Sequence, residues 1–90
     1  MIQLKEEKIR IIVDADDSQS VDQIINHAIW DMQEEGILDD VIMEFIQQLD
    51  LSLMLYKIKA DSHTELDNIK TAREILMNKI LHGIDAHYSL

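Results

Sequence analysis

Apolar side chains recur with the spacing of a helix in three stretches of this chain, and residues typical of helix ends stand at their borders. In the first stretch, Ser20 and Gln23 have the spacing of a capping box, so the first helix is expected to begin at Ser20. Gly36 ends it, because glycine tolerates the left-handed turn that often follows a helix. The expected buried face consists of Val21, Ile24, Ile25, Ala28, Ile29 and Met32.

A second helix is expected after Asp39 or Asp40, either of which can cap it, and its apolar positions continue to Tyr56. Its second half is ambiguous, because residues 49–58 are apolar on nearly all sides and also alternate partly with period two. Both a helix and a strand fit this segment. The helix is favoured, since the helical pattern enters the segment without a glycine or a proline.

A third helix and a short strand complete the expected fold. The helix opens at Ser62 or Thr64 and ends at Gly83. Residues 8–13 differ from the rest, because β-branched residues alternate there with other side chains, as in an extended strand. The expected fold class is therefore mainly α, a three-helix bundle with a short N-terminal β-strand at residues 8–13.

Composition supports a small folded unit. The 90 residues are 47% hydrophobic and 29% charged, which suits one domain over residues 1–90 rather than a disordered chain. Cysteine is absent, so we expect no disulfide and a reducing, cytoplasmic location. The first residues lack the apolar core of a signal peptide, and no stretch is long enough to span a membrane.

Charge is distributed unevenly along the chain. Acidic residues outnumber basic ones 18 to 8, and the segment from Ile11 to Tyr56 holds eleven acidic residues without a lysine or arginine. Such a segment repels phosphate and attracts cationic partners, although it can also serve only as a solvated surface. If the segment attracts cationic partners, it forms a binding face for a basic protein. Nucleic acid is not an expected partner, because the segment repels phosphate.

Trp30 is the candidate anchor of such a face. It lies roughly 100° outside the apolar arc of the first helix, where an indole is costly unless something covers it. Either another segment of the chain covers Trp30, or it anchors an interface. In the second case the expected partner-binding residues are Trp30, Asp31, Glu34, Glu35, Asp39, Asp40 and Glu44.

These features lead us to expect a non-enzymatic, acidic protein-binding module. Small acidic helical proteins such as immunity proteins, antitoxins and inhibitors antagonise basic nucleases or toxins by covering their substrate clefts, and complementary charge accelerates the encounter. A homodimer is also expected, because the apolar second half of the second helix would leave a sticky patch on a monomer. The expected dimer interface comprises Leu51, Leu53, Met54 and Leu55. The same patch fits a structural subunit of a larger complex equally well.

The order of elements suggests another function. A strand, a helix, a glycine turn and a helix over residues 8–55 resemble a ribbon-helix-helix module, a likeness that covers about half of the chain and rests on element order alone. It implies a dimeric DNA-binding regulator or antitoxin whose ribbon enters the major groove, with Lys8, Arg10 and Ile12 facing the bases. The acidic residues beside that ribbon argue against this alternative, because they repel DNA.

Patterns that could carry chemistry are weak. The acidic run at residues 14–18 fails as a calcium loop, since Gln19 and Ile25 stand where glycine and glutamate are needed. Carboxylates near Gly36 could hold magnesium, but no glycine-rich phosphate loop accompanies them. His27 and Asp31 share a helical face, yet two ligands do not make a metal site. We therefore expect no metal, no cofactor and no enzymatic activity.

Overall fold

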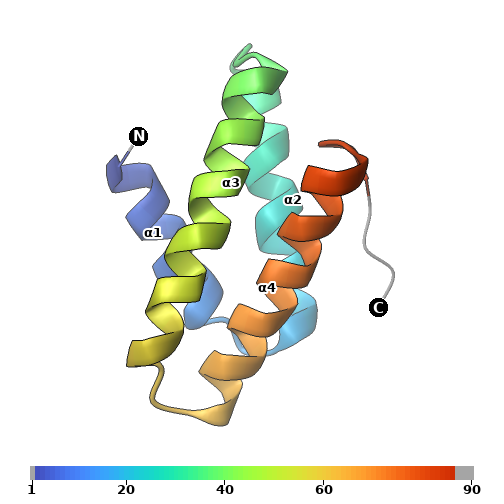
Figure 1. Ribbon diagram of the computed structural model, residues 1–90. Helices are drawn as coiled ribbons and strands as arrows, with labels where there is room; N and C mark the ends of the chain where they lie inside the picture. Colours follow the sequence, from blue (N-terminus) through green and yellow to red (C-terminus); the bar gives the residue numbers. More distant parts are fainter. Residues whose placement is uncertain (1, 87–90) are drawn as a thin grey trace.

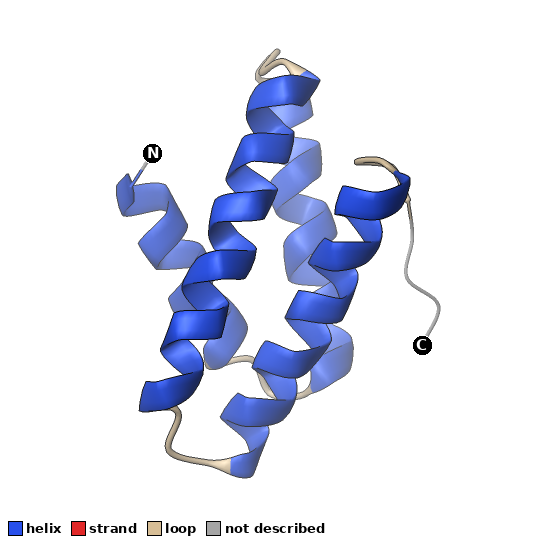
Figure 2. Ribbon diagram, in the orientation of Figure 1, coloured by secondary structure: helices blue, strands red, loops and turns tan. Residues whose placement is uncertain are grey.

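The computed structural model describes the backbone of residues 2–86 and the side chains of residues 6–86. These residues form four α-helices and a short 3₁₀ turn, with no strand among them (Figures 1 and 2). In chain order they are α1 (Ile2–Val13), α2 (Ser18–Glu34), α3 (Asp39–Tyr56), η1 (Lys57–Lys59) and α4 (His63–His82). The expectation of a mainly α fold is confirmed, but the bundle has four helices instead of three.

α4 is the central helix of the bundle, because the most extensive contacts of α1, α2 and α3 are each made with α4. α3 and α4 lie side by side in front of α2 (Figure 1). Each helix turns one apolar face inward, as helical spacing requires. The core consists of Ile9, Ile12, Val13, Val21, Ile25, Ile29, Met32, Ile42, Phe45, Ile46, Leu49, Leu53, Ile69, Ala72, Ile75 and Leu76.

The predicted strand at residues 8–13 is wrong, since this segment is the second half of α1. Ile9, Ile12 and Val13 are buried at helical spacing, whereas Ile11, which the strand would have placed beside Ile9 and Val13, is exposed. Packing against α3 and α4 therefore overrides the β preference of these branched residues. The described residues form no ribbon, and the DNA-facing role of Lys8, Arg10 and Ile12 loses its basis: Ile12 lies in the core.

A buried polar residue fixes α1 to α4. Asn68 of α4 is fully buried, and its Nδ2 donates hydrogen bonds to the carbonyl oxygens of Val13 at 3.1 Å and Ala15 at 2.9 Å. These carbonyls stand at the end of α1, where the helix itself supplies no N–H partner. Asn68 thus satisfies the C-terminal end of α1 from inside the core.

α2 begins earlier than the sequence pattern indicates. Asp17, rather than Ser20, occupies the N-cap position, and its side chain accepts hydrogen bonds from the backbone N–H and hydroxyl of Ser20. The backbone hydrogen bond to Ser20, which favours the charged form, lowers the pKa of Asp17. The prediction for the other end is confirmed: Gly36 has φ +80°, and Ile37 N–H donates to Met32 O, as in a Schellman motif.

The expected extent of α3 and the expected start of α4 are confirmed, whereas the expected cap of α3 is wrong. Leu38 takes the N-cap position of α3, so Asp39 and Asp40 lie in the first turn, where they complement the helix dipole without capping. The ambiguous segment is helical up to Tyr56 and continues into η1. At α4, Ser62 Oγ accepts from the Glu65 N–H. None of the helices within residues 2–86 combines the length and apolar character needed to cross a membrane.

Candidate functional site

The connection between α2 and α3 gathers acidic side chains at one end of the bundle. α2 ends at Glu34 and α3 starts at Asp39, so the last turn of one helix meets the first turn of the next (Figure 1). All the acidic residues of the predicted partner-binding set lie within a few turns of this connection and are exposed. We call them the acidic end: Asp31, Glu34, Glu35, Asp39, Asp40 and Glu44.

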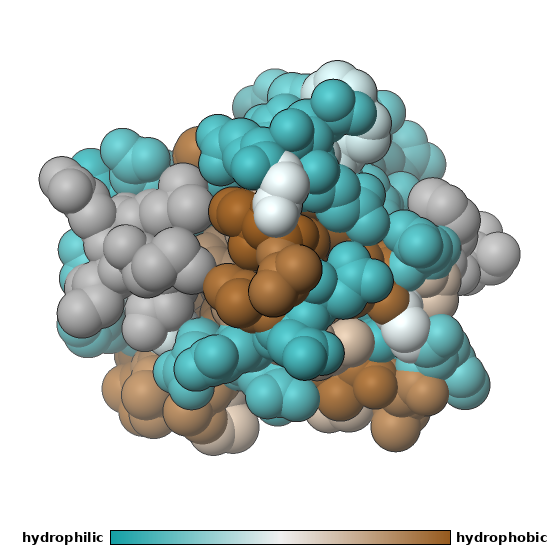
Figure 3. Space-filling model, turned by 90° about the horizontal axis from the view of Figure 1, so that it is seen from above, coloured by the Kyte–Doolittle hydropathy of each residue, from teal (hydrophilic) through white to brown (hydrophobic). Residues whose placement is uncertain are grey.

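The acidic end has an apolar centre that the sequence analysis missed. Leu38 is 72% exposed at the tip of the connection, and Val41 is exposed in the first turn of α3. Seen from above, hydrophobic side chains at this end are bordered by hydrophilic ones (Figure 3). The available signal was Leu38 itself, a leucine placed between a helix-ending glycine and two aspartates.

Trp30 is exposed, but acidic residues do not surround it. Its side chain is 54% exposed and stacks on His27, with ring centroids 6.0 Å apart. It lines a groove of about 450 Å³ together with amide side chains, Ile84 and Asp85. On the helical wheel of α2, Glu34 lies close to Trp30, whereas Asp31 is about 100° away. The structure therefore places Trp30 beside the acidic end and not within it.

The fold also brings a cation to the acidic end. Lys8 of α1 lines a groove of about 130 Å³ with Asp31 and Glu35 of α2. His27 Nε2 lies 3.8 Å from Asp31 Oδ1, with both side chains well exposed, so this contact adds little stability. The negative charge around Asp31 and Glu35 is therefore smaller than the composition of residues 11–56 indicates, because Lys8 lies outside that segment in sequence but next to it in space.

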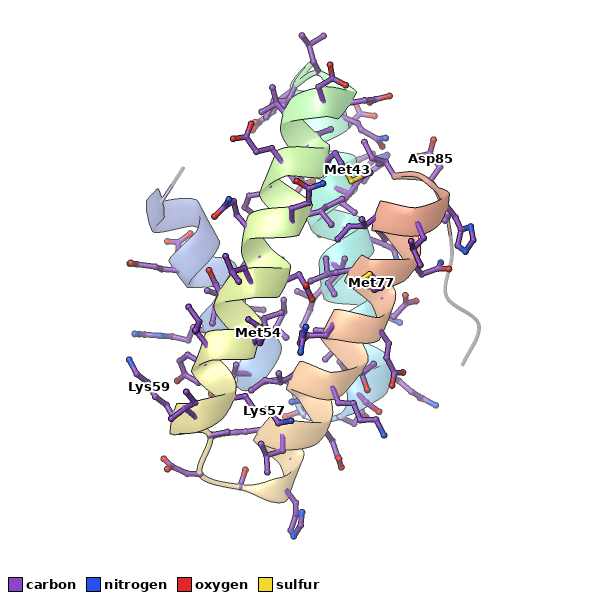
Figure 4. The ribbon with its side chains drawn as sticks, in the orientation of Figure 1. Met43, Met54, Lys57, Lys59, Met77 and Asp85 are labelled. Atoms are coloured by element: carbon purple, nitrogen blue, oxygen red, sulfur yellow. The ribbon has the colours of Figure 1, made fainter. Side chains whose placement is uncertain are left out.

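One wall of the Trp30 groove is a C-terminal strap, residues 83–86, which buried Lys79 holds in place. Lys79 Nζ donates to the carbonyl oxygens of Ile84 at 3.2 Å and Ala86 at 2.6 Å. Gln33 Nε2 adds a hydrogen bond of 3.2 Å to Asp85, which lies at the edge of the bundle (Figure 4). Burial lowers the pKa of Lys79, and the nearby negative charges of Asp22 and Asp85 oppose this effect.

The predicted dimer interface is only partly exposed. Leu53 is 0% exposed in the core, so its assignment to the interface is wrong. Leu51, Met54 and Leu55 are exposed on the outward face of α3, and Ile58 of η1 extends the same patch with 86% exposure. Helical spacing explains the difference, because Leu53 alone of the predicted set points to the α3 core face with Leu49 and Ile46.

Within residues 2–86, no three His, Asp or Glu side chains lie close enough together to hold a metal ion. Comparison with protein families, with curated proteins and with solved structures gives no match for this chain.

Proposed function

We propose that this protein is a non-enzymatic binding module whose acidic end docks on a basic partner protein and antagonises it. The supporting observation is that exposed carboxylates of α2 and α3 border the exposed side chain of Leu38 at the α2–α3 connection. An apolar anchor with charged residues around it is the common arrangement of a protein interface. Trp30 forms the outer edge of the surface, next to the strap.

Electrostatics favours a protein with a concentrated basic patch as the partner. The chain carries net charge −10, and six carboxylates of the acidic end face solvent. Opposite charge on the partner raises the association rate by steering, and this effect falls as salt screens the field. A basic cleft that binds phosphate or another anion presents such a patch, and occupying it would block the substrate of that partner.

A pair of charge-matched variants tests the proposal. One variant carries Glu34→Gln, Glu35→Gln, Asp39→Asn and Asp40→Asn, and the control neutralises exposed acids elsewhere, with Asp14→Asn, Asp16→Asn, Asp61→Asn and Asp67→Asn. Both variants have the same net charge. Partners captured by the wild type are identified, purified and titrated by calorimetry at increasing salt.

The proposal predicts a basic partner whose affinity drops with salt, is lost in the acidic-end variant and persists in the control. Trp30 is the only tryptophan, so its fluorescence reports directly whether the docked partner reaches the edge of the surface. If both variants bind the partner equally well, or if the partner is not basic, the acidic end is only a solvated surface.

A further inference from the structure

We propose that the groove along α4, bordered by Lys57 just after the end of α3, binds an amphipathic helix of a partner protein whose polar flank is acidic. This groove lies away from the acidic end and does not depend on the function proposed above. It has a volume of about 520 Å³ and is formed by one residue that follows α3 and by a long stretch of α4. Its lining residues are Lys57, Leu66, Ile69, Lys70, Arg73, Glu74, Met77, Asn78 and Leu81.

The shape of the groove fits a helix. Leu66, Met77 and Leu81 line the groove and are exposed along α4. Leu66 and Leu81 are fifteen positions apart, which at 1.5 Å per residue gives a stripe of about 22 Å. A partner helix of roughly fifteen residues matches this length, with apolar side chains at helical spacing entering the groove.

The apolar surface of the groove is adaptable. Met77 of α4 lines it, on a helix at the front of the bundle (Figure 4). Methionine is unbranched and polarizable, so a methionine-containing surface adjusts to side chains of different shape. Ile69 is buried and also lines the groove, so it gives the groove a firm floor. This combination suits capture of an apolar helix face.

The charge of the groove selects an acidic partner. Three of its lining residues are basic and one, Glu74, is acidic, in a chain whose net charge is −10. Arg73 Nε lies 3.1 Å from Asp50 Oδ1 and joins the two helices, which leaves Lys57 and Lys70 to face an incoming ligand. Lys57 points toward α4, whereas Lys59 points away from it (Figure 4). Covering Lys57 and Lys70 is favourable only if the partner supplies anions.

An anionic membrane is a poorer match than a helix. A membrane surface extends far beyond the groove and would meet the acidic side chains elsewhere on the protein, whereas a helix contacts the groove alone. At physiological ionic strength charges act over about 8 Å, so a ligand confined to the groove interacts mainly with its positive rim. A symmetric second copy is also disfavoured, because it would bring Lys57 and Lys70 of both chains together.

Synthetic peptides test this inference on the intact protein. The probe is a fluorescein-labelled 18-residue peptide with leucines at helical spacing and glutamates on its flanks, and the control peptide has glutamine in place of each glutamate, because a lysine peptide would be attracted to the acidic end. Binding is followed by fluorescence anisotropy for the wild type, for Lys70→Glu and for Lys59→Glu, which makes the same charge change outside the groove. Circular dichroism confirms that each variant is folded.

The glutamate peptide is expected to bind at least about tenfold more tightly than the glutamine peptide, with affinity that falls as salt rises. Lys70→Glu should weaken its binding by about fivefold or more, and Lys59→Glu by less than about twofold. Equal binding of both peptides, or equal weakening by both substitutions, would overturn the inference. So would binding to phosphatidylglycerol vesicles without binding to the peptide, or self-association that Lys70→Glu abolishes.

Discussion

Asn68 offers the sharpest test of how this fold is held together. Asn68→Ala removes the Nδ2 donor from the buried carbonyl oxygen of Val13 and the partly buried carbonyl oxygen of Ala15. Each buried acceptor that loses its partner costs about 1–3 kcal/mol. The substitution also removes Asn68 Oδ1, a buried atom without a hydrogen-bond partner among the described residues, which recovers part of that cost. We expect a net loss of about 2–4 kcal/mol.

This loss is large for a chain of 90 residues, because small domains are stable by about 5–15 kcal/mol in total. Urea denaturation followed by circular dichroism measures it directly, and thermal unfolding should show a midpoint lowered by about 4–8 °C per kcal/mol. Hydrogen exchange shows which part of the bundle is destabilised. Amides of α1 should lose protection first, because α1 is the helix that Asn68 attaches to α4.

A second substitution, Asn68→Asp, tests the role of the donor by pH. At pH 7 the new carboxylate faces two carbonyl oxygens without a proton to donate, so burial and repulsion raise its pKa above the usual value of about 3.9. Stability is then greatest below that usual pKa and is lost as pH rises through the raised one. Asn78→Asp on the same helix is the control, since Asn78 is partly exposed. Losses below about 0.5 kcal/mol for Asn68→Ala, or identical pH profiles for the two aspartate variants, would refute the reasoning.

Two further predictions concern the strap and the apolar patch of α3. Burial lowers the pKa of Lys79 below its ordinary value of 10.5. Between the lowered pKa and 10.5, the unfolded chain therefore binds more protons than the folded protein does. The unfolding free energy of the wild type should therefore rise with pH in that window relative to Lys79→Met, and parallel pH profiles would contradict this. The exposed patch at Leu55 and Ile58 predicts a dimer in sedimentation velocity that becomes monomeric in the double variant Leu55→Ser, Ile58→Ser, whereas a monomeric wild type would rule the dimer out.

The sequence predicted the helices that have long, regular apolar faces. α2, α3 and α4 follow such patterns, and Gly36 and Ser62 stand at the ends where the sequence places them. α1 was misassigned because its β-branched residues alternate locally, and the evidence for a helix lies in partners far away in sequence. Asn68, 55 positions from Val13, supplies part of that evidence. No local pattern identifies such a contact.

The candidate site divides in the same way. The helical wheel places Trp30 outside the apolar face of α2 but leaves open whether another segment covers it, and the structure shows it exposed, as are the predicted carboxylates. The neighbours of Trp30 could not be deduced, because the strap and its attachment through Lys79 depend on tertiary packing. The position of Lys8 beside Asp31 and Glu35 could not be deduced either, because its segment was expected to be a strand and not part of α1.

The two proposed surfaces have opposite charge, and α3 contributes to both. Its first turn belongs to the acidic end, and its last turn leads directly to Lys57 at the rim of the groove. α3 has 18 residues and is therefore about 27 Å long, roughly three times the 8 Å over which charges act at physiological ionic strength. Each partner thus meets the local charge and not the net charge of −10. The two proposals are therefore compatible, because a basic protein at one end and an acidic helix along α4 would each meet the charge that suits it.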